Sequence, residues 1–555
     1  MSGVTFQNES ASTPPRGTQV KTTLTADGHV QHVSLDGLSD SGENLSAAFT
    51  TEGHLEVALH APRLPFGSVH AESLHPIFQT DAVYGINAGL VSTSVSGTGS
   101  ATASDSSFIA ATGATQYSQG SIQSRKRLRY RAGQGIVGRF TAMFTAPVAQ
   151  SYQVAGFGHA EDGVFFGYAS GVGQPVGEFG ILYSTRGVRE VQTLTVTVGA
   201  TSAANATITL NSVAYTVPLT NASSANRTAY DIATFSTGYA GWKAEAVGAT
   251  VVFVADAVGN KTLTFSFGAG TTGASASFSE TLAGVAATEI FIPQSTWNGD
   301  RLDGTGRSGF TIVPTKYNVF QIKIQYLGAG SIVFEVEVTP PNGNNAEWVV
   351  AHTMRLPNTL TAVSFGNPSF PFTMAVYSAG STTNLTVKCG SFAGFVEGPK
   401  MLHGNRFSYY AQSTAVDASS YRALFTVQNT RYYGGRSNQA VINLLSASGA
   451  LKHTSPCIFY LIRGGALVGN PNFTRYATNS CSLVDTTATT VTFSTNDQII
   501  WSGHLGDTGE FDHRFNSGMM EEVTLQPGEW VTLAAKATTG SPAYVTGSIN
   551  TREDQ

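Results

Sequence analysis

The chain has 555 residues, only 12% of them are charged, and its formal net charge is −5. Charged residues make up about 25% of an average soluble protein. A surface so poor in charge suits a chain that packs against copies of itself or against other proteins. A net negative chain is also poorly suited to binding polyanions, so we expect no nucleic-acid partner.

The secondary structure is expected to be almost entirely β. Glycine is abundant, with 60 residues, and the frequent Thr, Val and Phe favour strands joined by tight turns over long helices. The N-terminus is polar and lacks the hydrophobic region of a secretory signal. The longest apolar runs, such as 249–258, fall far short of the roughly 20 residues that a membrane helix needs. We therefore expect a protein made in the cytoplasm, without membrane insertion.

Residues 1–80 are expected to form an N-terminal arm with short strands. The alternating runs between residues 21 and 75 are broken by Gly and Asp-Gly, which is typical of brief strands and turns. The stretch 62–79 is punctuated by proline and has no hydrophobic period. We interpret it as an extended segment that docks on another surface. A long linker is the equal alternative.

Residues 81–191 and 289–400 are expected to form one central β-sandwich. Short alternating segments such as 136–146 and 151–160 lie between glycine turns, and the same pattern returns from residue 320. Strands at this spacing favour an antiparallel sandwich.

Residues 192–288 differ in composition from the segments around them: they are rich in Thr and Ala and have few charged residues. We expect a small inserted α+β module, with one helix near 224–236, in a surface loop of the central sandwich. The strands at 178–184 and 320–328 would then belong to one sheet. Two sequential domains are the alternative. Residues 401–555 alternate in strand fashion to the end and predict a second sandwich, of jelly-roll type.

The most basic stretch of the chain is SRKRLRYR, which begins at residue 124. In a β-strand, alternate residues share a face, so Leu128 and Tyr130 would face the core. The opposite face would carry a row of arginines, our interface candidates: Arg125, Arg127, Arg129 and Arg131. This row would pair with Asp and Glu nearby, or it would form an intersubunit or docking strip through bidentate contacts to carboxylates. Nucleic-acid binding is the third alternative, and no broader basic field surrounds the strip.

The sequence offers little catalytic or metal-binding chemistry, and we predict no catalytic residue, no metal ligand and no cofactor. Glu335 and Glu337 lie on one face of an expected strand but lack the further carboxylates of a glucanase pattern. The acidic and histidine residues of 504–514, and Asp300 with Asp303, match no metal-ligand spacing and are interpreted as polar loops and turns. Two of the three cysteines, Cys389 and Cys457, lie in apolar strands and are expected in cores.

Exposed aromatic rings are the usual means of sugar binding, although most aromatics of this chain alternate as core residues do. Trp242 and Trp297 lie in turn-like sequence. They are our two candidates for glycan contact.

Several segments occur in a characteristic order: 65–87, 124–135, 156–168, 179–183, 303–310, 318–336 and 525–555. Together they resemble a family of structural proteins from tailed bacteriophages and some large DNA viruses, described as fibre, tail or virion-surface proteins. The resemblance covers most of residues 60–555, and it implies a virion component without a catalytic motif. The central sandwich is also similar in strand pattern to concanavalin-like lectin domains, a fold that often binds glycans and also hosts endoglucanases.

We therefore expect a non-enzymatic virion structural protein, a fibre, spike, decoration or tail component. It would assemble with copies of itself, as a trimer by analogy with fibres, and with other virion proteins through its arm. Attachment to host-surface glycans would be an additional role. A free glycan-binding lectin or adhesin is the alternative, and a polysaccharide depolymerase is the third hypothesis.

Overall fold

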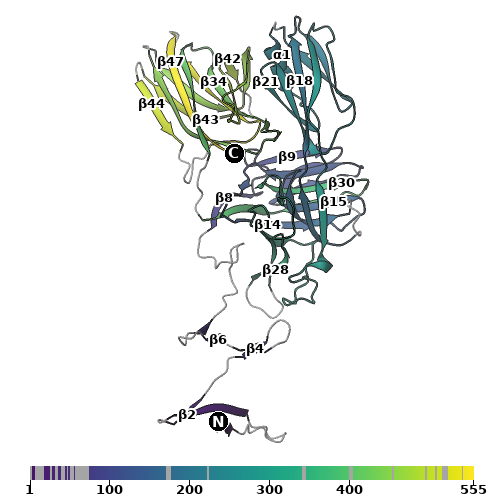
Figure 1. Ribbon diagram of the computed structural model, residues 1–555. Helices are drawn as coiled ribbons and strands as arrows, with labels where there is room; N and C mark the ends of the chain where they lie inside the picture. The colour runs from purple at the N-terminus through teal and green to yellow at the C-terminus, as the bar shows by residue number, and fades with distance from the viewer. Residues whose placement is uncertain are drawn as a thin grey trace. The chain divides into compact units, whose positions relative to one another are not determined.

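The computed structural model describes residues 74–555 except for short gaps, together with the backbone of seven strands before them. The gaps are 171–176, 222–223, 340–345, 399–403, 453–454, 494–496, 507–508, 516–522 and 540–541. The chain divides into two compact units, Met1–Ala71 and Glu72–Gln555. The second unit contains a central sandwich, an inserted module and a C-terminal sandwich (Figure 1).

The N-terminal unit contributes short antiparallel strands. One three-stranded sheet has the order β1-β2-β3, and two further pairs are β4-β5 and β6-β7. Their bounds are β1 Gly3–Phe6, β2 Thr18–Thr25, β3 Gly28–Gln31, β4 Asp36–Leu38, β5 Asn44–Ser46, β6 Ala48–Phe49 and β7 Leu55–Glu56.

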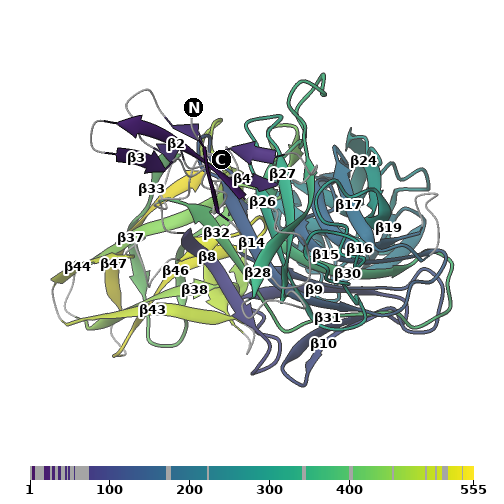
Figure 2. The same cartoon turned by 90° about the horizontal axis from the view of Figure 1, so that it is seen from below.

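The central sandwich consists of two antiparallel sheets that enclose one core (Figure 2). The first has the path β10-β11-β31-β14-β26-β27-β28, and β32 pairs with β14 and β8. Its bounds are β8 Leu74–Asp81, β10 Ser100–Ser104, β11 Ser107–Ala111, β14 Ile136–Phe144, β26 Asn318–Ile324, β27 Ile332–Val338, β28 Glu347–Met354, β31 Thr386–Cys389 and β32 Ser391–Glu397.

The second sheet has the order β25-β17-β16-β15-β30-β12-β9. Its bounds are β9 Val91–Ser96, β12 Gln119–Ser124, β15 Ser151–Gly158, β16 Gly163–Ala169, β17 Gly180–Thr185, β25 Thr288–Pro293 and β30 Phe372–Ser378. A further pair joins β13 (Leu128–Arg129) to β29 (Ser369–Phe370), and a short 3₁₀ helix spans Gln294–Thr296.

Phenylalanine side chains fill the core between these two sheets. The Phe166 and Phe320 rings, from opposite sheets, have centroids 4.6 Å apart, and Phe140 stacks on Phe320 at 5.4 Å. Such rings contribute large buried areas and favourable ring contacts. A Cβ atom at Gly138 would lie 2.0 Å from the Phe157 ring, so only glycine lets the ring approach this strand.

Two details of the predicted organisation are wrong. Strand β8 pairs with β32 over its whole length, so the end of the predicted arm, up to residue 80, belongs to the central sheet. Strands β17 and β26 lie in different sheets, not in one. The strand that follows the module and pairs with β17 is β25, with Thr185 opposite Thr288. The module therefore connects two neighbouring strands, whose ends are already adjacent.

The inserted module has two antiparallel sheets, of order β21-β22-β18-β24 and β20-β19-β23, and one helix. Helix α1 lies within the predicted segment, and the Ser224 side chain caps its N-terminus. The bounds are β18 Arg189–Val198, β19 Ala204–Leu210, β20 Val213–Leu219, α1 Ala225–Ala233, β21 Trp242–Val247, β22 Thr250–Val258, β23 Ser266–Gly268 and β24 Ser275–Leu282.

The C-terminal sandwich packs a sheet of path β33-β47-β37-β44, extended by β45, against a sheet of path β39-β42-β34-β46-β38-β43, extended by β41 and β40. The bounds are β33 Asn405–Val416, β34 Arg422–Asn429, β35 Tyr432–Tyr433, β36 Arg436–Ser437, β37 Val441–Leu451, β38 Cys457–Arg463, β39 Ala466–Gly469, β40 Thr474–Arg475, β41 Ser482–Asp485, β42 Ala488–Thr492, β43 Gln498–Leu505, β44 Gly509–Arg514, β45 Thr524–Leu525, β46 Trp530–Ala537 and β47 Ala543–Asp554.

The predicted fold class, all-β with several antiparallel sandwiches, is confirmed. Cys389 and Cys457 are fully buried in the two sandwich cores, as expected from their apolar strands. No helix in the part of the chain that the structure covers is long and apolar enough to cross a bilayer.

Candidate functional site

The arginine strip, defined as Arg125, Arg127, Arg129 and Arg131, is not one regular strand. Only Leu128 and Arg129 have strand geometry, paired with Phe370 and Ser369. Leu128 is buried in the central core, as predicted. The ring of Tyr130 packs edge-on against Tyr326. The four arginines therefore lie on an irregular segment of the central sandwich and do not share one face of a strand.

Three of the four arginines bind carboxylates of the C-terminal sandwich. Arg125 Nη1 lies 2.9 Å from Glu529 Oε1. Arg129 Nε lies 3.5 Å from Asp554 Oδ1, and Arg131 Nη2 lies 2.8 Å from Asp554 Oδ2. Asp554 is the last residue of β47, so that strand carries its carboxylate to the central sandwich.

These contacts answer the question that the sequence left open. The strip is an interface that pairs with carboxylates, but its partners belong to another domain of the same chain. The side chains of Arg125, Arg129 and Arg131 thus form ion pairs with carboxylates of the same chain.

The fourth arginine, Arg127, lies deeper, in a polar cluster. Glu161 Oε1 lies 3.9 Å from Arg189 Nε, and Gln439 Nε2 of the C-terminal sandwich donates to Glu161 Oε2 at 3.2 Å. Burial raises the pKa of Glu161, although the Arg189 charge opposes this. Burial, with the Arg189 charge, lowers the pKa of Arg127 to about 10, so its guanidinium stays protonated at neutral pH.

His159 belongs to the same cluster and is neutral. Burial and then the Arg127 charge hold its pKa well below the usual value. The approach of His159 Nδ1 to Glu161 Oε2, at 3.4 Å, is therefore not an ion pair at neutral pH. Nδ1 instead lies 3.3 Å from the backbone N–H of Glu161, which donates to it.

The inserted module also binds the C-terminal sandwich, through a second seam. Thr430 Oγ1 donates to Glu245 Oε1 at 2.6 Å, and the Arg431 N–H donates to Oε2 at 2.7 Å. Burial raises the pKa of Glu245, while these donors favour its charged form. The Leu467 N–H donates to Tyr230 Oη at 2.9 Å. An apolar cluster surrounds these bonds; its fully buried members are Tyr230, Ala246, Ala423, Ile462, Leu467, Phe473, Leu483, Ala488, Val491 and Ala534.

Both tryptophans predicted to contact glycans are core residues, so that prediction is wrong. Trp242 is 5% exposed and packs in the module core, edge-on to Phe265. Trp297 is 3% exposed, and its Nε1 donates to the Ile292 carbonyl at 3.3 Å. Neither ring has a free face on which a sugar could stack. Trp242 begins strand β21 and Trp297 follows the short 3₁₀ helix, and both side chains pack into their domain cores.

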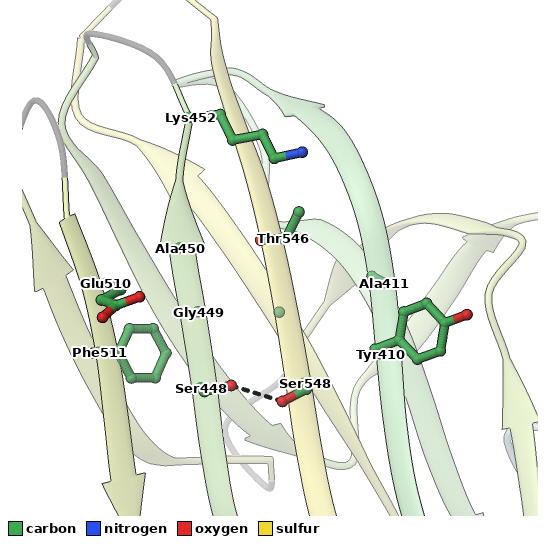
Figure 3. A pocket seen from close by; sticks show the side chains of 11 residues that line it. Tyr410, Ala411, Ser448, Gly449, Ala450, Lys452, Glu510, Phe511, Thr546 and Ser548 are labelled. Carbon is green, nitrogen blue, oxygen red and sulfur yellow. Dashed lines mark hydrogen bonds between the residues drawn. The ribbon is translucent and has the colours of Figure 1, made fainter.

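An open groove lies across the outer face of β33, β47, β37 and β44, a feature that the sequence reasoning missed. Its volume is about 530 Å³. Figure 3 shows its floor, where the hydroxyls of Ser448 and Ser548 are joined by a hydrogen bond of 2.6 Å. We call it the hydroxyl groove; it is lined by Tyr410, Ala411, Ser448, Gly449, Ala450, Lys452, Glu510, Phe511, Thr546, Gly547 and Ser548.

The groove combines one exposed ring with short polar side chains. Tyr410 is 66% exposed and stands on β33, at one side of the floor residues Thr546 and Ser548 (Figure 3). Lys452 and Glu510 supply one charge of each sign. The sequence signal that could have indicated this groove is the alternation in β47, where Thr546 and Ser548 lie between buried residues.

Two of the carboxylates singled out in the sequence, Glu335 and Asp300, have structural partners. Glu335 is buried and accepts from Lys323 Nζ at 2.8 Å. Asp300 accepts from the Leu302 and Ser308 N–H groups, at 2.9 and 2.7 Å, as expected of a turn residue. Within the described ranges, no three His, Cys, Asp or Glu side chains gather as metal ligands would, and Asp507 lies outside those ranges.

Together the fold and the two seams define a multidomain all-β protein in which two sandwiches and a module contact one another through buried polar and apolar surfaces. No protein-family model and no curated protein matches the chain. Among solved structures, it is similar to the Faustovirus major capsid protein, with 8% identity and a TM-score of 0.11 over 81% of this chain and 90% of that chain. A TM-score of that size carries no argument about fold or role.

Proposed function

We propose that the chain is a non-enzymatic structural protein of a virion, which acts by assembly. The N-terminal unit docks on the particle or on other copies of the chain, and residues 72–555 form the part that the particle displays. The proposal builds on the resemblance of the ordered segments to phage and large-virus structural proteins.

The observation that carries the proposal is the division of the chain. Residues 1–71 form one unit, which includes the short strands β1 to β7, and residues 72–555 form the other. The second unit is held together by its own contacts, through Asp554 at one seam and Glu245 at the other. The small first unit is therefore available to attach the chain to a larger assembly. The low charge of the whole chain fits the same role.

Sedimentation of the chain with particles tests this proposal. In density gradients of particles from the source culture, the full chain should band with the virions, at a copy number comparable to other structural components. A chain that lacks residues 1–71 should stay in the soluble fractions while remaining folded. A full chain found only in soluble fractions would contradict a virion role.

The hydroxyl groove favours a second role, the binding of neutral host-surface glycans. Sugars present hydroxyls and apolar C–H faces; Ser448, Ser548 and Thr546 could exchange hydrogen bonds with the former, and the Tyr410 ring could stack on the latter. A lectin without any virion role would use the same groove, so particle sedimentation separates the two functions.

Screening on a glycan array, followed by one substitution, tests the glycan role. Tyr410→Ala should weaken binding of any glycan captured by the wild type about tenfold, because a ring contact contributes about 0.5–1.5 kcal/mol in addition to the area that it buries. The control is Tyr117→Ala, which removes a ring of similar exposure, 64%, from the central sandwich. Equal loss in both variants, or no captured glycan, would remove this role.

A further inference from the structure

A small cavity lies at the seam between the central and C-terminal sandwiches. Its volume is about 60 Å³, several times the roughly 10–15 Å³ that one water molecule needs. Arg127 and Ser369 line it from the central sandwich, and Asn443, Gln526 and Asp554 line it from the C-terminal sandwich. Any group bound there would contact both domains.

The lining carries more positive than negative charge. Among the described lining residues, Arg127, Arg129 and Arg131 lie beside one carboxylate, that of Asp554, and Lys126 has a further partner of its own. That carboxylate is already bound on both oxygens, by Arg129 and Arg131. The lining of the cavity is therefore cationic. Both oxygens of Asp554 are already paired, so this carboxylate does not pair with Arg127 as well.

Two of the three nitrogens of the Arg127 guanidinium have no acceptor. Its Nε and Nη1 atoms are buried and form no hydrogen bond. In the part of the chain that the structure covers, no carboxylate lies within ion-pair distance of it, and the nearby Glu161 is engaged by Arg189 and Gln439. The group stays protonated at neutral pH because its pKa is about 10. A buried cation without an acceptor is costly, and an anion in the adjoining cavity would remove that cost.

Ser369 is a second donor without a partner in the same cavity. Its side chain is 2% exposed, and its Oγ atom forms no hydrogen bond. Gln526 Oε1 also lacks a donor, and rotation of this amide by a half-turn would present its NH₂ group instead. Arginine, serine and amide donors around a cationic pocket match the chemistry of a tetrahedral oxyanion, which accepts several hydrogen bonds at once.

We propose that this cavity binds a small inorganic oxyanion of the phosphate and sulfate class, with Arg127 as its principal ligand and Ser369 as a second. Both of these ligands come from the central sandwich, and the Gln526 amide lines the cavity from the C-terminal sandwich, so an oxyanion that also accepts from Gln526 would join the two sandwiches. Its role is to hold the domains of the displayed unit in one arrangement.

Thermal unfolding of the full chain in phosphate and in chloride tests the site. At constant ionic strength, the unfolding temperature of the wild type should rise with phosphate concentration, by a constant increment for each tenfold increase above the dissociation constant. Sulfate should act in the same way. A rise that chloride reproduces in full would show only general salt stabilisation and would overturn the proposal.

Two variants then locate the effect. Arg127→Met should abolish the phosphate-dependent rise, and without phosphate it should be at least as stable as the wild type, because a buried unpaired charge is removed. Arg125→Gln, in the same strip but outside the cavity lining, should retain the full rise. A phosphate-dependent rise that persists in Arg127→Met would place the bound anion elsewhere.

Calorimetric titration of the wild type with sodium phosphate keeps the proposal testable if Arg127→Met does not fold. The expected result is one site per chain, with at least threefold weaker binding in Ser369→Ala. The absence of specific phosphate binding to the wild type would exclude the site.

Discussion

Asp554 is the residue on which the contact between the two sandwiches depends most directly. Its two oxygens bind Arg129 and Arg131 across the seam, and its side chain is largely buried. Ion pairs with partly buried, hydrogen-bonded partners contribute more than exposed ones. The pairing with carboxylates was predictable from the alternating arginines, whereas the identity of the carboxylate was not, because it lies more than 400 residues away in the sequence.

Substitution of Asp554 by Asn should destabilise the C-terminal sandwich and its docking. We expect a loss of about 1–3 kcal/mol, because two guanidinium groups lose a charged partner. Scanning calorimetry should record a fall of several degrees in the unfolding temperature, at about 2–4 °C per kcal/mol. The control is Asp512→Asn, whose exposed pair with Arg514 should contribute less than about 0.5 kcal/mol. Equal stability of both variants would show that the seam contributes nothing.

His159 should make the protein sensitive to mild acid. Burial and the Arg127 charge keep its folded-state pKa well below the ordinary value of 6.5. The unfolded chain therefore binds a proton near pH 6.5 that the folded chain does not, and the free energy of unfolding falls as the pH drops below that value. The raised pKa of Glu161 acts in the opposite direction, since protonating its folded form is comparatively easy.

A comparison with His159→Gln isolates the histidine contribution. The stability of the wild type relative to the variant should decline between about pH 6.5 and pH 5, by up to about 1.4 kcal/mol per pH unit. Urea unfolding at each pH measures the difference. A difference that does not change with pH would mean that His159 titrates normally in the folded protein.

At the scale of elements, the inserted module extends from two neighbouring strands and also binds a second domain. Its ends meet where β17 pairs with β25, and its helix α1 and strand β21 contribute Tyr230 and Ala246 to the apolar cluster shared with the C-terminal sandwich. Composition predicted a distinct segment and periodicity predicted its helix. Neither composition nor periodicity could predict that the module docks on the C-terminal sandwich. A helix face that contacts another domain has the same spacing of apolar residues as a face that packs on its own domain core.

Tyr230→Phe tests this docking. The variant keeps the ring but leaves the buried Leu467 N–H without its acceptor, at a cost of about 1–3 kcal/mol. The control is Tyr215→Phe, which removes a longer, exposed hydrogen bond to the Ala240 carbonyl and should cost less than about 0.5 kcal/mol. Chemical denaturation of both variants provides the comparison. Identical stabilities would contradict a firm contact between the module and the C-terminal sandwich.

The tryptophans show where sequence reasoning about sites fails. Turn-like flanking residues predict exposed backbone, but they do not predict the direction of a large side chain, and both rings turn inwards. The hydroxyl groove was missed for a related reason. Ser and Thr at alternate positions of β47 indicate only a polar face, and whether that face is hollow depends on residues from three other strands.

At the scale of the whole molecule, the all-β class followed from composition and alternation, since both act locally along each strand. The sheet to which each strand belongs did not follow, because the pattern within a strand does not identify the strands that pair with it; β17 and β26 were expected in one sheet but lie in opposite sheets. Residues 72–555 pair three of the four strip arginines, Arg125, Arg129 and Arg131, with their own carboxylates. This leaves the N-terminal unit as the segment we expect to join copies of the chain.

The most direct test of this account is the native mass of the full chain and of residues 72–555, measured by light scattering after size-exclusion chromatography. The account predicts an oligomer, a trimer by the fibre analogy, for the full chain, and a folded monomer once residues 1–71 are removed. An oligomer that survives the truncation would contradict the account, since the copies would then associate through the sandwiches. A full chain that is monomeric both in solution and in the presence of purified particles would contradict assembly as its function.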